Sequence, residues 1–332
     1  MGDPAGVGPE IIVRALSSSV LRDLADITVI GDKWVFEKVQ GTGCRVQGSK
    51  LTLGTRHLAL GANFIDLNNV AHKAFKFGKI SANCGRASIQ YIGKALQLIK
   101  DGELDCLVTC PISKEAAHYA GFPFPGHTEY LAKEAKIDDF VMMLMNKYIK
   151  VSLVTRHIPL KEVSRRLTVG NIYRTIVITL ASLRSLFGIV NPRLAVCGLN
   201  PHASDAGIIG SEEGEIIVPA VAKSRRFSSQ IYGPLPCDSV FASAIRGKYD
   251  AVIAMYHDQA LMPLKLSDFD SGVNLTLGLP YARTSVLHGT AFDIAGKNIA
   301  NPNSLIEAIK VAVKCAKNLK LTGRRKAWGS HF

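Results

Sequence analysis

Short apolar runs that end in clusters of polar residues are the feature that most constrains the fold of this chain. The clearest run is Ala251–Met255, which leads through Tyr256 into His257, Asp258 and Gln259. Comparable runs, interspersed with amphipathic helical patterns, lie at 104–109, 140–145, 151–155 and 193–198. This alternation is typical of an α/β protein with a largely parallel sheet. Because ligands bind at the carboxyl edge of such sheets, the polar clusters hold the candidate functional residues.

The spacing of apolar residues also locates several other elements. It predicts helices at 78–101, 160–166, 169–187 and 303–320. We interpret residues 41–75 as irregular, residues 233–241 as a loop that presents a carboxylate, and the basic tail after 320 as mobile. The chain begins inside a Gly/Pro-rich loop, at Gly2–Gly8, and the strand that usually precedes such a loop is expected to lie upstream or to be missing.

Length and composition place the chain among ordinary globular proteins. Its 332 residues suffice for two domains, and its apolar fraction of 47% and charged fraction of 20% are typical of that class. We find neither an apolar run long enough to span a bilayer nor a signal-peptide pattern. The seven cysteines are scattered and form no Cys-x-x-Cys pair, which argues against a zinc ribbon or a disulfide framework. A cytoplasmic location is therefore predicted.

The formal net charge of +13 is large, and a solvated basic surface together with an anionic ligand would explain it. Nucleic acid, an anionic membrane surface and a small anionic substrate all fit a basic protein. The basic residues form only short clusters, such as Lys223–Arg226, and no nucleic-acid-binding motif accompanies them. We therefore expect no nucleic acid and no membrane as partners, and favour a phosphate-bearing small molecule.

Three histidines occupy equivalent positions, each just after an apolar run: His157, His202 and His257. One such histidine is more often structural, but three at the same sheet edge favour a divalent transition metal such as zinc, cobalt or nickel. Asp238 and Asp258 would then add a ligand, orient a histidine or act as a base. The alternative for both carboxylates is simple loop capping.

A second group of residues suits a phosphate. Lys265 and Arg283 are cations near predicted strand ends, and His127, Thr128 and Asn274 are neutral donors. Each alone is more often an ordinary surface residue, and Thr128 is also a plausible helix N-cap. The set predicts a phosphate site only if the fold gathers its members.

Other familiar catalytic patterns are missing from the sequence. It contains no Gly-x-Ser-x-Gly nucleophile motif and no Gly-x-Gly-x-x-Gly dinucleotide fingerprint. A serine hydrolase is therefore not indicated. A nicotinamide cofactor, if one binds, would have to bind by another arrangement than the Rossmann fold.

Six segments, taken together, are similar to one known family. They are Gly2–Glu10, Pro125–Glu129, Gly198–Ala203, Gly233–Pro236, Ala254–Gln259 and Gly272–Pro280. Over almost the whole chain they resemble the 4-hydroxythreonine-4-phosphate dehydrogenase family of vitamin B6 biosynthesis. The stretch His288–Pro302 further resembles the adenosine-binding loop of isocitrate and isopropylmalate dehydrogenases, which bind NAD without a Rossmann fold.

The resemblance implies a two-domain α/β/α sandwich of the isocitrate/isopropylmalate dehydrogenase-like type, with its active site in the interdomain cleft. We place a cofactor-side domain at 1–125 plus 270–332, and a central domain with the metal ligands and dimer contacts at 126–269. The resemblance also implies a homodimer whose metal site is shared across the interface. It implies NAD or NADP as cofactor and a divalent metal such as Zn, Co, Mg or Ni.

Individual residues carry over from the family pattern. The metal ligands implied are His157, His202 and His257, with Asp238 and Asp258 as the nearby catalytic carboxylates. The substrate-binding positions implied are His127, Thr128, Lys265, Asn274 and Arg283, and the cofactor-binding positions are His288, Gly289, Asp293 and Asn301. Leu287 stands where the family usually has Asp, which removes a charge beside the cofactor loop.

The implied reaction is the NAD(P)-dependent oxidation of 4-phosphooxy-L-threonine to a β-keto acid. This acid then loses carbon dioxide to give 3-amino-2-oxopropyl phosphate. One alternative is a related dehydrogenase of erythronate or threonate 4-phosphate, because the same groups would serve either substrate. An alternative from another class is a metal-dependent phosphohydrolase, which would release phosphate without NAD.

Overall fold

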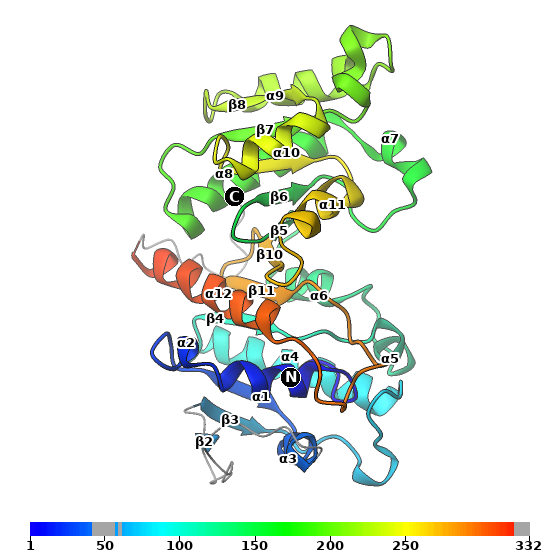
Figure 1. The fold of residues 1–332 in the computed structure, drawn as a ribbon, viewed down its shortest axis with the longest axis vertical. Helices are drawn as coiled ribbons and strands as arrows, with labels where there is room; N and C mark the ends of the chain where they lie inside the picture. The colour runs from blue at the N-terminus through cyan, green and yellow to red at the C-terminus, as the bar shows by residue number, and fades with distance from the viewer. Residues whose placement is uncertain (42–56, 59–61, 322–332) are drawn as a thin grey trace. The chain divides into compact units, whose positions relative to one another are not determined.

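The computed structural model describes residues 1–41, 57–58 and 62–321, which form two compact units. One unit contains Met1–Leu131 and Arg283–Val313, and the other contains Ala132–Ala282 and the chain from Lys314. Both units combine helices with β-strands (Figure 1), which confirms the predicted α/β fold class. Each unit is therefore built from segments that are far apart in the sequence.

The first unit contains a three-stranded sheet in the order β1-β3-β2, in which β1 and β3 are parallel. Two further strands of this unit, β4 and β11, are neighbours. The strands are β1 (Thr28–Gly31), β2 (His57–Leu58), β3 (Ala62–Asp66), β4 (Cys106–Thr109) and β11 (Ala282–Val286). The helices are α1 (Gly8–Leu16), α2 (Ser19–Arg22), α3 (Lys33–Gly41), η1 (His72–Ala74), α4 (Ala82–Lys100), α5 (Lys114–Tyr119), α6 (His127–Glu134) and α12 (Asn303–Leu321).

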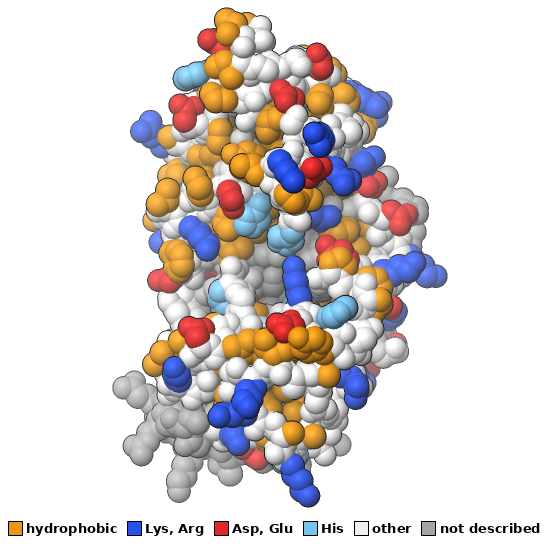
Figure 2. All heavy atoms as spheres, turned by 90° about the vertical axis from the view of Figure 1, so that its right-hand side faces the viewer, with side chains coloured by type: hydrophobic (Ala, Val, Ile, Leu, Met, Phe, Trp, Pro, Cys, Tyr) orange, Lys and Arg blue, Asp and Glu red, His pale blue; other side chains and the backbone are white. Residues whose placement is uncertain are grey.

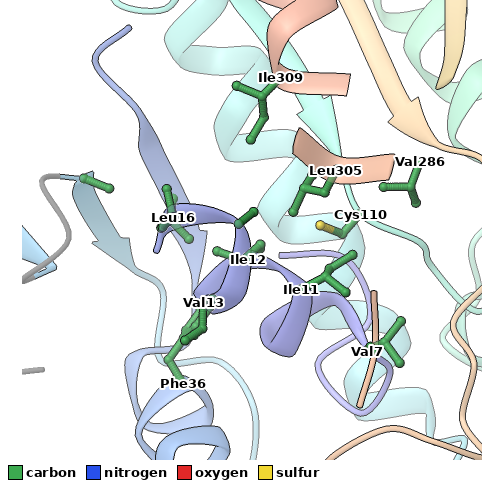
Figure 3. Close-up of a cluster of buried hydrophobic side chains, with 14 of the residues drawn as sticks. Val7, Ile11, Ile12, Val13, Leu16, Phe36, Cys110, Val286, Leu305 and Ile309 are labelled. Carbon is green, nitrogen blue, oxygen red and sulfur yellow. The ribbon is translucent and has the colours of Figure 1, made fainter. Parts of the chain in front are cut away.

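A cluster of buried apolar side chains joins the segments of this unit. Figure 3 shows Ile11 of α1 in one group with Phe36 of α3, Val286 of β11 and Leu305 of α12. Burying a side chain of this size stabilises the fold by about 1.5–3 kcal/mol. Because β11 and α12 come from the end of the chain, this core ties the N-terminal and C-terminal segments together.

The second unit contains six strands in the order β10-β5-β6-β9-β7-β8. The four strands from β6 to β8 are parallel, whereas β5 and β10 run antiparallel to their neighbours. The strands are β5 (Val141–Met145), β6 (Lys150–Leu153), β7 (Leu194–Cys197), β8 (Ile231–Leu235), β9 (Ala251–Ala254) and β10 (Val273–Leu277). All residues of β7 and β9 are buried, as expected for central parallel strands.

Helices lie on both sides of this sheet (Figure 1). They are η2 (Leu160–Glu162), α7 (Val163–Arg166), α8 (Val169–Phe187), η3 (Pro201–Gly207), η4 (Glu213–Ile217), α9 (Val218–Ser224), α10 (Cys237–Ile245) and α11 (His257–Ser267). Helix α8 packs against α9, and α10 packs against α11. Among the helices of the described residues, none is both long enough and apolar enough to cross a membrane.

The ends of α8 agree with the sequence prediction for local physical reasons. Thr168 caps the helix by accepting the Asn171 N–H at 3.1 Å, and the Asn171 side chain accepts the Thr168 N–H at 3.0 Å. This reciprocal pair satisfies two N–H groups that the first turn leaves unbonded. Gly188 ends the helix in a left-handed conformation, with φ of 72°. The helix predicted at 169–187 is confirmed.

The prediction of a loop at 233–241 is wrong. Residues up to Leu235 belong to β8, and α10 begins at Cys237. Pro234 lies within β8 and Pro236 directly precedes α10. Because proline is typical of loops and weakens a strand pattern, neither element is predicted from the sequence. Strand β8 tolerates Pro234 because it lies at the edge of the sheet, where one side of the strand has no ladder partner within the described chain.

Two further differences concern 41–75 and the residues after Tyr256. The segment 41–75, which was predicted to be irregular, contains the strand β3. The side chains of β3 alternate only weakly between buried and exposed, so the sequence does not show a clear strand pattern. The rest of this segment lies partly in 42–56 and 59–61, outside the described residues, as does the basic tail beyond 321. The polar cluster after Tyr256 begins a helix, α11, which Pro263 disguises.

Candidate functional site

The three candidate metal-binding histidines follow three neighbouring strands of the second unit. His157 comes after β6, His257 after β9 and His202 after β7. Strand β9 lies between the other two and is parallel to both, with Leu153 paired to Ala254 in its ladder with β6. Because parallel strands end at the same edge, the fold brings all three loops to one side of the sheet.

His157 and His257 lie close to each other. Their ring centroids are 5.7 Å apart. An ion about 2 Å from an imidazole nitrogen lies roughly 3 Å from the ring centroid, so one ion is within reach of both rings. Figure 2 shows exposed histidine side chains on one face of the molecule, with lysine and arginine side chains on the same face. The geometry of this pair therefore fits a shared metal ion.

Asp258 orients the ring of His257. The Nδ1 atom of His257 lies 2.8 Å from Oδ1 of Asp258. A neutral imidazole that donates from Nδ1 to a carboxylate presents an unprotonated Nε2, which is the form that binds a metal. His257 and Asp258 are adjacent in the first turn of α11, which keeps their side chains close together.

His202 lies in an unusual turn. The five residues from His202 to Ala206 all have positive φ, between 48° and 69°, although none of them is glycine. In the described part of the chain, no group of three His, Cys, Asp or Glu side chains lies close enough to hold a metal ion. A single chain thus gathers two of the three histidines and leaves His202 outside the pair.

The other candidate residues of this unit are more dispersed. Asn274 lies on β10 opposite Leu144, and its Oδ1 is buried with no hydrogen-bond partner among the described residues. Lys265 lies in the last turn of α11, with Nζ 5.2 Å from the centroid of the Phe269 ring. Asp238 is exposed in the first turn of α10. An unsatisfied buried amide oxygen is costly, so Asn274 is a plausible contact for a ligand.

The first unit places Arg283 beside two threonines. Arg283 lies on β11 and is only 1% exposed. Its Nη2 donates to Oγ1 of Thr109 at 2.8 Å, and its Nη1 makes a longer contact of 3.4 Å with Oγ1 of Thr128. Thr109 is a residue that sequence reasoning missed, although it ends β4 directly before the loop that leads into α5. A buried guanidinium lined by hydroxyl groups is suited to an anion.

His127 lies beside this arginine and is held in its neutral form. Burial is the main cause that lowers the pKa of His127 well below 6.5, and the charge of Arg283 lowers it further. A hydrogen bond to the backbone of Cys110 works in the opposite direction. Within the described chain, Nε2 of His127 is buried and has no hydrogen-bond partner. A neutral imidazole with one unsatisfied nitrogen can exchange a hydrogen bond with a bound ligand.

The candidate cofactor loop lies between β11 and α12 and is anchored by α1. Oε1 of Glu10, a buried residue, accepts the Ala300 N–H at 2.7 Å, and Nη1 of Arg14 donates to the Ala300 carbonyl at 2.7 Å. No role for Glu10 or Arg14 is predicted from the sequence. The sequence does not predict this contact, because both residues are separated from Ala300 by almost the whole chain.

Within this loop, all four candidate residues are exposed to solvent. His288 is exposed and contacts the Gly289 carbonyl, and Asp293 is exposed. A methyl group added to Gly289 would meet nothing within 4 Å, so the backbone there is open to approach. Asn301 is exposed as well, and its Oδ1 accepts the Asn303 N–H at the start of α12. The loop is therefore fixed at its base and accessible at its surface, which fits a dinucleotide.

We predict that His127 remains neutral across the physiological range. Below pH of about 6.5 a histidine in the unfolded chain takes up a proton, whereas the folded His127, with its lowered pKa, does not. His127 therefore lowers stability as the pH falls from about 6.5 toward its folded pKa. Nitrogen chemical shifts of labelled histidine should show one neutral ring at pH 5.5 that is missing from His127→Gln. A His127 signal that titrates near pH 6.5 would contradict the described burial.

Known proteins are similar to this chain over most of its length. Residues 23–312 match the family described as pyridoxal phosphate biosynthetic protein PdxA. The 4-hydroxythreonine-4-phosphate dehydrogenase of Desulforapulum autotrophicum is 43% identical over 315 residues, covering 94% of this chain and 93% of the relative. The D-threonate 4-phosphate dehydrogenase of Cupriavidus necator is 42% identical over 324 residues, covering 95% of this chain and 96% of the relative.

A solved structure shares the fold. The crystal structure of 4-hydroxythreonine-4-phosphate dehydrogenase from Klebsiella pneumoniae superposes with a TM-score of 0.84. It is 36% identical in sequence, and the match covers 95% of this chain and 96% of that one. The likeness therefore extends over both units and is not confined to one motif.

Proposed function

Because the chain belongs to the PdxA family of pyridoxal phosphate biosynthetic proteins, we propose that it oxidises 4-phosphooxy-L-threonine. Its relatives are named as dehydrogenases of phosphorylated four-carbon acids, and the chain is a dehydrogenase of this class. Two observations support the proposal: one unit holds an imidazole pair with an adjacent carboxylate, and the other unit holds a buried arginine beside two threonine hydroxyls.

The proposed reaction begins at the C3 hydroxyl of the substrate. The hydroxyl loses its proton, C3 loses a hydride, and the carbon becomes a ketone. NAD or NADP, when bound, accepts the hydride. The product is a β-keto acid, whose carboxylate leaves as carbon dioxide to give 3-amino-2-oxopropyl phosphate. The protein's task is to fix the substrate so that C3 is presented in one orientation.

The phosphate is the natural handle for that orientation. We propose that Arg283 and Thr128 bind it, and that His127 donates or accepts a hydrogen bond through its unsatisfied nitrogen. The neutral state of His127 limits its role to hydrogen bonding and leaves the charge to Arg283. Lys265 and Asn274 are proposed as further substrate contacts, with the buried amide oxygen of Asn274 as an acceptor.

We propose that His157, His202 and His257 hold a divalent metal, such as Zn, Co, Mg or Ni. When bound, such an ion acts as a Lewis acid that favours ionisation of the substrate hydroxyl. Asp258 presents His257 in the required tautomer, and Asp238 is proposed as the second carboxylate of the site. The cofactor is proposed to contact His288, Gly289, Asp293 and Asn301.

We also propose a homodimer in which two chains complete the metal site. One observation in favour is the separation of His202 from the pair formed by His157 and His257. Another is an apolar patch near that pair, where Met262 and Leu266 of α11 are 62% and 88% exposed. Exposed apolar side chains of this size favour burial against a partner.

The second candidate is a D-threonate 4-phosphate dehydrogenase. The relative from Cupriavidus necator bears that name and is almost as similar to this chain as the first relative. The two substrates share the phosphate and the hydroxyl that is oxidised, and they differ at the amino position. The residues proposed above serve both equally, so the choice rests on a direct assay.

We predict that the protein reduces NAD or NADP with 4-phosphooxy-L-threonine, and that a chelator abolishes this activity. The assay follows absorbance of the reduced cofactor against a panel that includes threonate 4-phosphate and erythronate 4-phosphate. Faster turnover of threonate 4-phosphate would assign the second candidate. Release of inorganic phosphate without cofactor reduction would overturn the dehydrogenase proposal and favour the phosphohydrolase.

We predict that Arg283→Lys raises KM for the phosphorylated substrate by about 10- to 100-fold. The lysine keeps the charge but loses the planar fork, and a hydrogen bond to a charged group contributes about 1.5–3 kcal/mol. Arg193→Lys is the matched control, because Arg193 pairs with Asp250 at 3.1 Å elsewhere in the fold. Equal KM values for the two variants, at unchanged circular dichroism, would remove Arg283 from the phosphate site.

A further inference from the structure

Gln259 connects the ends of two of the histidine-bearing strands. Its side chain is buried and makes two hydrogen bonds with backbone groups. Oε1 accepts the Met255 N–H at 2.7 Å, and Nε2 donates to the Gly198 carbonyl at 2.8 Å. Met255 directly follows β9, and Gly198 directly follows β7. The amide therefore continues the connection between these strands beyond their last ladder bond.

Thr155 makes the equivalent connection between β6 and β9. Its hydroxyl donates to the Met255 carbonyl at 2.7 Å, and its own N–H donates to the same oxygen at 3.1 Å. Met255 is thus held from both sides, with its N–H bonded to Gln259 and its carbonyl bonded to Thr155. His157 and His257 each lie two residues beyond these anchored positions.

Glu213 fixes the segment that runs from Gly198 to His202. Its buried carboxylate accepts the N–H groups of Leu199 and Asn200, each at 2.7 Å, and the Asn200 side chain at 2.9 Å. A Cβ added at Gly198 would lie 2.9 Å from the Ala203 Cα, so the backbone folds tightly at this point. The carbonyl that Gln259 binds belongs to the same anchored segment.

We propose that Gln259 is a positioning residue for the metal site, because it sets where β7 and β9 deliver His202 and His257. The amide serves both strand ends with one planar group, because its oxygen accepts from one and its nitrogen donates to the other without any change of protonation. The inference rests on the proposed function, which supplies the metal role of the histidines. Gln259 bonds to backbone groups at both strand ends, and its side chain also shares a hydrogen bond with the Cys237 thiol.

The alternative is that Gln259 merely stabilises the fold. A buried polar bond contributes about 1 kcal/mol in either case, so stability alone cannot separate the two roles. Thr179 provides a matched control. It is fully buried in the same unit, and its hydroxyl donates to the Ser152 hydroxyl at 2.9 Å, between α8 and β6 and not at the strand ends.

The test compares Gln259→Met, Gln259→Glu and Thr179→Val in the full chain. Co²⁺ affinity is measured by competition with a chromophoric chelator, and the melting temperature is measured on the metal-free protein. Gln259→Met loses both backbone hydrogen bonds at similar volume. Gln259→Glu can still accept from Met255 but, when ionised, cannot donate to Gly198, so it provides a second variant should the first fail to fold.

We expect the Gln259 variants to bind Co²⁺ about 10- to 100-fold more weakly, the range typical of residues that support metal ligands. Their visible Co²⁺ spectrum should also change, since it reports the arrangement of the ligands. Thr179→Val should lower the melting temperature but leave affinity and spectrum unchanged. Unchanged affinity in the Gln259 variants, or an equal loss in Thr179→Val, would overturn the positioning role alone. Failure of the wild-type protein to bind Co²⁺ would overturn the proposed metal function together with it.

Discussion

The parallel hydrogen-bond ladder that joins β6, β9 and β7 is the constraint on which the candidate metal site depends. Parallel strands all end at the same edge, so His157 and His257, which are far apart in sequence, lie close together. The buried Val and Ala side chains of β7 and β9 hold this ladder in place from both faces. The polar loops then extend from a rigid base, which is what a site that orients a substrate requires.

Beyond the ladder, buried polar groups take over the task of fixing the backbone. The residues from His202 to Ala206 are left-handed and none is glycine, so each makes the turn less favourable by about 1–2 kcal/mol. The hydrogen bonds of Glu213 and Gln259 to the preceding segment act in the opposite direction. Strained backbone that its surroundings hold in place is common at binding sites. The turn at His202 therefore fits a functional role better than a purely structural one.

The sequence predicted the fold class and the strands that precede the candidate ligands, because both depend on strongly apolar runs. Helix α8 and the strand Ala251–Ala254 were found for the same reason. Elements that contain proline, namely β8 and α11, were missed, since proline obscures the local pattern. The contacts of Thr109, Glu10 and Gln259 could not be predicted, because each joins segments that are distant in the sequence. The pairing of two histidines without the third is likewise visible only in three dimensions.

In the proposed homodimer, His157, His202 and His257 form one metal site that two chains complete. Mixing chains that carry His202→Ala with chains that carry His257→Ala tests it most directly. If each site combines His157 and His257 of one chain with His202 of the other, a mixed dimer keeps one intact site. Random exchange should then restore about a quarter of wild-type activity, because half of the dimers are mixed and each has one working site of two. A mixture that exchanges subunits but stays as inactive as either variant would contradict the account.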